Sequence, residues 1–231
     1  MFSKLSIIIP AYNEQNTITD VLEKVSSVIL PYNIEKQVLI VDDCSSDQTK
    51  NKIIDFINQD SKGVFQIISH KKNKGKGACI HSAIPFINGD LLIFQDADLE
   101  CNPDDYALLI EEMIASKADV VYGNRFADVK DKWKIHYLMN RLLTRLSNIK
   151  TGLNLIDMEC CYKLIQSKYI HKIPLSEKRF GIEPEITSKL SRIKSVVFSQ
   201  TAISYSKRNY ESGKKIGWKD GFRALYCIVK Y

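Results

Sequence analysis

Two aspartates close an apolar run near the middle of the chain. Asp96 and Asp98 follow residues 91–94, a run typical of a buried strand. Side chains alternate along a strand, so carboxylates at positions i and i+2 point the same way. A bound cation relieves their repulsion, and oxygen ligands favour Mg²⁺ or Mn²⁺, which complete their coordination with phosphates. Two aspartates separated by one residue are more often part of a solvated turn, which here would include a third acid, Glu100. Their place directly after a core strand nevertheless makes them a candidate metal site.

The elements that would position these acids alternate along the chain. Runs typical of strands occupy residues 5–10, 38–41, 65–68, 91–94 and 120–122. Helical spacing of apolar residues lies between them, first at Ile18, Val21, Leu22 and Val25. This alternation predicts an α/β fold with a mainly parallel central sheet flanked by helices. Folds of this class bind ligands beyond the carboxyl ends of their strands.

The remaining elements are less regular. One helix is expected over residues 78–87, and another from Pro103, with Leu108, Leu109 and Met113 facing inward. An amphipathic stretch covers residues 130–150. A further strand-like run covers residues 195–205.

Polar side chains gather where the predicted strands end. They are Tyr12, Asn13, Glu14, Asp42, Asp43, Asp96, Asp98, Glu100, Asn124 and Arg125. The sequence contains neither the dinucleotide-binding glycine pattern nor a Walker loop. Tyr12 can border a base, Glu14 or Asp43 can accept hydrogen bonds from its edge, and a metal can hold a diphosphate. The pattern indicates a nucleotide-sugar site.

Size and composition narrow the class of protein. The 231 residues, 45% hydrophobic and 26% charged, predict one soluble domain with a substantial core. No apolar run approaches the roughly 20 residues that span a bilayer, and the N-terminus does not resemble a signal peptide. The six cysteines and four histidines lack zinc or disulfide-framework spacing. A reduced, cytoplasmic location is expected.

The positive charge of the chain is concentrated at its C-terminal end. The net charge is +6, and from Lys189 onward ten basic residues face two acidic ones. Such a segment favours phosphates, an anionic membrane or nucleic acid. Residues 216–231 also place apolar side chains at near-helical spacing, namely Trp218, Phe222, Leu225, Tyr226 and Val229. This tail could lie in a membrane interface or pack on the sheet of the chain itself.

Eight motifs in order carry a family resemblance across nearly the whole chain. They are IIIPAYNE (7–14), VDDCSSD (41–47), NKGKG (73–77), DADLE (96–100), GNRF (123–126), DMECCYKL (157–164), FGIEPEIT (180–187) and SYSKRNYESGKKIGWKDG (204–221). Together they resemble the family 2 glycosyltransferases of GT-A fold, and most closely the branch of dolichyl- and polyprenyl-phosphate sugar synthases. The resemblance implies a single domain, 1–231, whose residues 1–125 bind the nucleotide sugar and whose residues 126–231 face the acceptor.

The resemblance also implies roles for individual residues. Those expected at the nucleoside are Pro10, Tyr12, Glu14, Val41 and Asp43. Asp96 and Ala97 would border the ribose and diphosphate, while Asp98 and Glu100 would bind Mg²⁺ or Mn²⁺. Mannose synthases of this branch often carry glutamine where this chain has Glu100, so metal preference or donor specificity could differ.

Further roles follow from the same resemblance for Arg208, Lys214, Asp157 and a second cation, and from position in the sequence for the others. Arg208 and Lys214 would engage phosphate groups in a closing loop, and Lys132, Lys134 or His136 could add a second cation after Arg125. For Arg125 a substrate contact is favoured over a surface ion pair. A site role is slightly favoured for Asp157, against a cap or a salt bridge. The acids Glu183 and Glu185 are at least as well explained as helix N-terminal residues. Lys74 and Lys76 are expected in a solvated basic loop.

The acceptor decides whether a base is needed. A phosphate monoester, with a second pKa of about 6, is already anionic at neutral pH, whereas a sugar hydroxyl must lose a proton. The resemblance implies an inverting, metal-dependent transferase that moves a sugar from a GDP- or UDP-sugar to a polyprenyl phosphate at a membrane surface. Asp157, Glu159, Glu183 and Glu185 keep transfer to a glycan hydroxyl open. A non-catalytic nucleotide- or nucleic-acid-binding protein is the distant alternative, and the acid set argues against a nucleic-acid partner.

Overall fold

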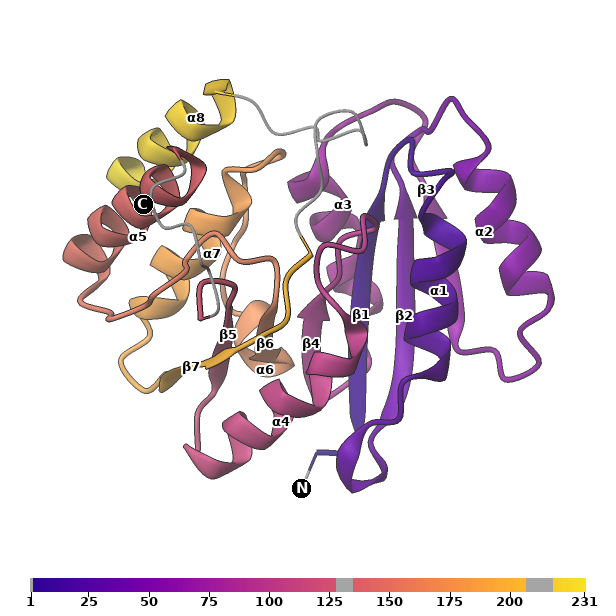
Figure 1. The fold of residues 1–231 in the computed structure, drawn as a ribbon, viewed down its shortest axis with the longest axis horizontal. Helices are drawn as coiled ribbons and strands as arrows, with labels where there is room; N and C mark the ends of the chain where they lie inside the picture. Colours follow the sequence, from indigo (N-terminus) through magenta and orange to yellow (C-terminus); the bar gives the residue numbers. More distant parts are fainter. Residues whose placement is uncertain (1, 128–134, 207–217) are drawn as a thin grey trace.

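The computed structural model describes residues 2–127, 135–206 and 218–231. A seven-stranded sheet in the order β3-β2-β1-β4-β6-β5-β7 forms its centre (Figure 1). The strands are β1 (Lys4–Ala11), β2 (Glu35–Asp42), β3 (Phe65–Ser69), β4 (Leu91–Phe94), β5 (Val120–Asn124), β6 (Lys163–Gln166) and β7 (Phe198–Ala202). All five strands predicted between residues 5 and 122 are present, and β7 lies within the predicted run 195–205.

Most neighbouring strands run parallel, which confirms the predicted mainly parallel α/β sheet. β1 pairs with β2 along its whole length and with β4 on its other side. β6 is the exception, because it lies antiparallel between β4 and β5. The sequence did not indicate β6: it is four residues long, and its first residue, Lys163, is a charged side chain that is fully buried. Insertion of β6 brings its first residue to the edge where β4 and β5 end.

Helices flank the sheet on both faces. They are α1 (Ile18–Ser27), α2 (Thr49–Asn58), α3 (Lys76–Ala83), α4 (Tyr106–Ala115), α5 (Ile135–Thr151), α6 (Ser167–Ile170), α7 (Ile182–Ser191) and α8 (Trp218–Lys230). Short 3₁₀ turns cover Pro31–Asn33, Ile84–Phe86 and Pro103–Asp105. In Figure 1, α1 and α4 lie in front of the sheet, while α3 lies behind it.

Two helix predictions need correction. The helix expected over 78–87 is α3, which begins earlier and ends at Ala83, where a 3₁₀ turn containing Pro85 follows. Proline has no backbone N–H and its ring clashes with the preceding turn, which accounts for this end. In α4, Leu109 and Met113 are buried as expected, but Leu108 is exposed and Tyr106 takes an inward position instead.

The C-terminal helix packs on other helices. α8 lies beside α5 and contacts α7 (Figure 1). Its buried face consists of Ala224, Cys227 and Ile228. The apolar residues that the sequence singled out are exposed among those described, namely Phe222, Leu225, Tyr226 and Val229. The alternative in which they pack on the sheet is therefore wrong. Among the described helices, none is both long enough and apolar enough to cross a bilayer.

Candidate active site

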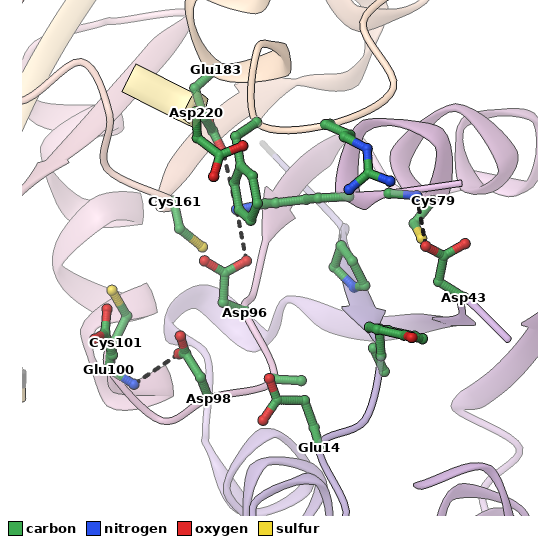
Figure 2. A pocket seen from close by; sticks show the side chains of 18 of the residues that line it. Glu14, Asp43, Cys79, Asp96, Asp98, Glu100, Cys101, Cys161, Glu183 and Asp220 are labelled. Carbon is green, nitrogen blue, oxygen red and sulfur yellow. Dashed lines mark hydrogen bonds and ion pairs between the residues drawn. The ribbon is translucent and has the colours of Figure 1, made fainter. Parts of the chain in front are cut away.

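One pocket lies where the polar strand ends meet. It is lined by residues that follow β1, β2, β4 and β5, and by residues that precede β6 and α7 (Figure 2). Of the predicted site residues, those that line it are Pro10, Tyr12, Glu14, Asp43, Asp96, Ala97, Asp98, Glu100 and Arg125. Val41 is buried within β2, and neither it nor Asp157 belongs to this lining. Arg208, Lys214, Lys132 and Lys134 lie outside the described residues, as does the side chain of His136.

Unusual backbone conformations shape the loops that carry the pocket acids. Asn13, Cys44 and Leu99 have φ of 50°, 62° and 63°, in the left-handed region that few non-glycine residues adopt. Each follows the carboxyl end of a strand by a few residues. The Asn13 side chain accepts a hydrogen bond from the Ser46 backbone N–H at 2.8 Å, which ties the loops after β1 and β2 together. Strain of this kind persists where the surrounding structure holds it, as at binding sites.

The turn at Leu99 brings three acids together after β4. The backbone N–H of Glu100 donates to Asp98 Oδ1 at 3.0 Å (Figure 2). The Tyr205 hydroxyl donates to Glu100 Oε2 at 2.9 Å. Burial, with repulsion from Asp96 and Glu100, raises the pKa of Asp98 to about 7. A divalent cation stabilises a partly desolvated carboxylate that lies among other acids, and the ligands that these three acids offer to a cation are all oxygens. The residues therefore fit Mg²⁺ or Mn²⁺.

Lys76 lies at the centre of the pocket wall. Its Nζ is 2.7 Å from Asp96 Oδ1 and 3.0 Å from Glu183 Oε1, and its side chain is only 11% exposed. Burial alone would raise the pKa of Asp96, but the charge of Lys76 and hydrogen bonds from Lys76 and Cys161 together outweigh it and lower that pKa. The prediction of a solvated loop is thus wrong for Lys76, although Lys74 is exposed. The sequence feature that could have indicated a closely packed position for Lys76 was the glycine on each side of it.

Those two glycines allow the loop to dock closely. Gly75 has a φ of +96°, and a Cβ added there would lie 2.6 Å from the Lys178 carbonyl oxygen. A Cβ added at Gly77 would overlap the carbonyl oxygen of Glu177. The loop before α3 therefore packs directly on the segment before α7. This contact places Lys76 between Asp96 and Glu183.

Asp43 organises the opposite end of the pocket. Its carboxylate accepts hydrogen bonds from the backbone N–H groups of Lys74 and Gly75, the latter at 2.7 Å, and His70 Nδ1 lies 2.6 Å from its Oδ1. Asp43, His70 and Cys79 bring possible metal ligands within 4.8 Å of one another, which their sequence spacing did not indicate. Both ring nitrogens of His70 are engaged by side chains, Nδ1 by Asp43 and Nε2 by Ser82 Oγ at 2.8 Å, so these contacts form a hydrogen-bond network.

Arg125 is held by Asp157 at the other side of the sheet edge. Its Nε donates to Asp157 Oδ2 at 2.7 Å and a terminal nitrogen donates to Oδ1 at 2.8 Å. Asp157 is 1% exposed, so its carboxylate is turned to Arg125 and away from the pocket lining. Arg125 itself lines the pocket, beside the ring of Tyr205. The structure therefore places Asp157 behind Arg125.

Two further glutamates complete this wall. Glu183 is 3% exposed and pairs with both Lys76 and Lys163. Glu159 lines the same pocket, and its Oε1 is buried without a hydrogen-bond partner among the described residues. Burial, with repulsion from Glu183, raises the pKa of Glu159 to about 7. Glu183 lies at the start of α7, as the helix N-terminal interpretation expected, and it also forms part of the pocket wall.

Sequence reasoning missed several lining residues. They are Asn73, Gly75, Cys79, Cys101, Cys161, Arg179, Phe180, Tyr205 and Asp220, in addition to Lys76, whereas Glu159 and Glu183 were expected as possible bases for a hydroxyl acceptor and do line the pocket. Most of the missed residues lie outside the segments that directly follow a predicted strand, although Cys101 directly follows Glu100.

Curated relatives share most of the chain. Dodecaprenyl-phosphate galacturonate synthase of Rhizobium johnstonii is 24% identical over 233 residues, which cover 98% of this chain and 65% of the relative. Undecaprenyl-phosphate 4-deoxy-4-formamido-L-arabinose transferase of Edwardsiella ictaluri is 26% identical over 188 residues, 81% of this chain and 57% of the relative. The chain thus spans about three fifths of the length of these relatives.

Solved structures show the same fold. Glucosyl-3-phosphoglycerate synthase of Mycobacterium tuberculosis matches with a TM-score of 0.73 at 17% identity, over 99% of this chain and 80% of that one. The same enzyme with Mn²⁺, uridine diphosphate and phosphoglyceric acid matches with a TM-score of 0.71 at 14% identity, over 99% and 78%. The likeness confirms the predicted GT-A type of fold. The model of the family described as Glycosyl transferase family 2 matches residues 6–173, and the chain belongs to that family.

Proposed function

We propose that this chain is a metal-dependent glycosyltransferase that moves a sugar from a nucleotide diphosphate to a polyprenyl phosphate. The observation that carries the proposal is the position of Asp96, Asp98 and Glu100 in the middle of one pocket, between Asp43 on one side and Arg125 on the other. An extended nucleotide sugar laid along this edge would place its diphosphate at the three acids. Such a ligand needs a cation there and polar groups at both ends.

The donor roles follow from this placement. Tyr12, Glu14 and Asp43 would contact the nucleoside, with Pro10 and Val41 shaping that end, and Asp96 with Ala97 would border the ribose and diphosphate. Asp98 and Glu100 would hold Mg²⁺ or Mn²⁺, which when bound neutralises negative charge on the leaving diphosphate. The names of neighbouring solved structures include UDP with either metal, which supports a UDP-sugar as the first donor to test.

The proposed acceptor, a polyprenyl phosphate, is supported by the names of the curated relatives and by the ionisation of phosphate groups. Both curated relatives carry a polyprenyl phosphate in their names. A phosphate acceptor needs cations and positioning and no base. Arg125 lines the pocket on the proposed acceptor side, residues 126–231 follow it, and Arg208 with Lys214 would add phosphate contacts by family resemblance. Asp157 would act by orienting Arg125.

One observation favours a second candidate, transfer to a glycan hydroxyl. Glu159 lines the pocket with a pKa of about 7, which suits a general base at neutral pH. The two candidates differ in their product. Incubation with a radiolabelled nucleotide sugar, Mn²⁺ and undecaprenyl phosphate should yield a lipid-extractable product that mild acid cleaves. Label that enters only glycan would favour the hydroxyl acceptor.

We also propose that the face formed by α5 and α8 contacts the membrane that holds such a lipid. Leu142, Ile149 and Val229 are 49%, 82% and 69% exposed. Lys150 donates to the Val229 carbonyl and joins the two helices, so a basic side chain lies among these apolar ones. Apolar side chains mixed with cations are typical of helices that lie in an anionic membrane interface.

A further inference from the structure

The order of strands converts the pocket into a linear series of subsites. From β2 the edge passes through β1, β4 and β6 to β5, so Asp43 and Tyr12 lie on one side of Asp96 and Asp98, and Glu159, just before β6, lies on the other. This inference rests on the proposed function. If the nucleoside lies at the carboxyl ends of β2 and β1 and the diphosphate at the end of β4, the sugar reaches the start of β6.

The wall at this end presents a carboxylate oxygen that needs a donor. Glu159 Oε1 is buried and has no hydrogen-bond partner among the described residues. Burying a polar atom without a partner is costly, so native proteins leave few such atoms, and a ligand group often supplies the missing bond. A carboxylate accepts hydrogen bonds and, when protonated, donates through one oxygen only. The matching group on a sugar is a hydroxyl or an amine.

Among the described residues, three cations on this side of the pocket are already paired with carboxylates. Lys163 pairs with Glu183, Lys76 pairs with Glu183 and Asp96, and Arg125 pairs with Asp157. A carboxylate on the sugar would therefore meet Glu159 and Glu183 without gaining any of these three cations. Like charges placed together in a partly buried site strongly disfavour binding.

We propose that the sugar subsite lies at the start of β6 and that Glu159 selects a donor sugar carrying a hydroxyl or amine there, against uronic acids. The selection has both an attractive part, the unpaired Glu159 oxygen, and a repulsive part, the excess of acid. It would separate this chain from the galacturonate synthase to which it is related, whose name specifies a uronic acid.

Matched donors test the proposal directly. Calorimetry with Mn²⁺ would compare UDP-glucose with UDP-glucuronic acid, which differ only in a CH₂OH or a carboxylate, and GDP-mannose with GDP-mannuronic acid. The informative pair is the one whose base the protein accepts. Within that pair, wild-type protein should bind the donor with the neutral sugar at least about tenfold more tightly than the donor with the uronic acid. E159Q removes the charge while keeping the shape, so it should reduce that ratio about threefold or more, chiefly by improving uronate binding. E23Q, which changes an exposed acid of α1, should leave the ratio unchanged.

The outcomes separate this proposal from the one on which it rests. Binding of UDP or GDP alone should be the same in E159Q and wild type, because the nucleoside and metal subsites are untouched. Equal or tighter binding of the uronate by wild-type protein, or a ratio unchanged by E159Q, would overturn the sugar selection while leaving the transferase proposal standing. Failure of every nucleoside diphosphate to bind with Mn²⁺ would overturn both.

Discussion

Lys76 Nζ lies 2.7 Å from Asp96 Oδ1, and this ion pair joins the first residue of α3 to the acid loop after β4. The lysine also reaches Glu183 at the start of α7, so three segments meet through one side chain. The acids alone would repel one another, and Lys76 offsets part of that repulsion before any ligand binds.

Removing this lysine should destabilise the fold. K76M leaves the buried Glu183 and the partly exposed Asp96 with one cation fewer, and the expected cost is about 2 kcal/mol, between that of an exposed pair and that of a fully buried one. The free energy of unfolding, measured with urea, should fall by about that amount. K74M changes an exposed neighbour and should have little effect. The double variant K76M/E183Q should recover part of the loss, and an unchanged urea midpoint for K76M would contradict the buried pair.

Loss of Asp98 should abolish metal-dependent nucleotide binding. D98N keeps the size of the side chain but removes one of the oxygen charges proposed to hold the cation, so affinity for UDP or GDP with Mn²⁺ should drop about 100-fold. A thermal-shift titration with and without Mn²⁺ measures this, since a ligand stabilises in proportion to its binding. D20N, on the exposed surface of α1, is the matched control. Nucleotide binding that ignores both Mn²⁺ and D98N would remove the basis for the proposed metal site.

Glu159 should make stability depend on pH. Its pKa rises from an ordinary value of 4.5 to about 7 in the fold, because burial of its carboxylate and repulsion from Glu183 and Asp157 outweigh the attraction of Lys163 and Arg125. The folded state therefore favours the protonated acid, and this contribution is lost as pH rises from about 5 to 8, by up to about 3 kcal/mol. The stability difference between E159Q and wild type should grow over that range. E23Q should show a constant difference, and a pH-independent E159Q difference would mean that Glu159 is not buried as described.

The close docking at Gly77 should not tolerate a side chain. G77A would drive Cβ into the Glu177 carbonyl oxygen, so the loop must move and Lys76 with it. We expect a loss of about 2 kcal/mol in unfolding free energy and weaker donor binding. Gly221 of α8 has open space around its Cβ position, and G221A should be neutral or stabilising by up to about 1 kcal/mol. Similar effects of the two substitutions would argue against the packing described for Gly77.

Exposed apolar residues of α5 and α8 should matter for membrane contact only. The double variant I149S/V229S should weaken co-sedimentation with vesicles that contain anionic lipid, since each lost side chain removes apolar area from the interface. Folding and nucleotide binding should not change. I29S, at an equally exposed position after α1, serves as the control. Equal vesicle binding by all three proteins would refute the proposed membrane face.

The local sequence pattern was sufficient to predict many of the strands and several of the pocket residues. Strand periodicity marked β1 to β5, and the acids that follow β2 and β4 were found because side-chain direction in a strand repeats every two residues. Parallel strands then bring their ends to one edge, so Asp43, Asp96 and Asp98 could be expected to share a pocket. The family resemblance extended that set, and the structure places nine of the predicted residues in the lining.

Tertiary structure decided which charges face one another. Asp43 meets His70 across 27 positions of sequence, and Arg125 meets Asp157 across 32. Such pairs have no period in the sequence, so Asp157 could not be distinguished from a residue of the pocket, nor Lys76 from a solvated loop. The short antiparallel β6, inserted between β4 and β5, set Glu159 beside the acid cluster. The sequence determined the elements and their strand-end acids because these depend on neighbours along the chain, whereas the partners of Lys76, Arg125 and Glu159 depend on contacts that exist only when the sheet is assembled.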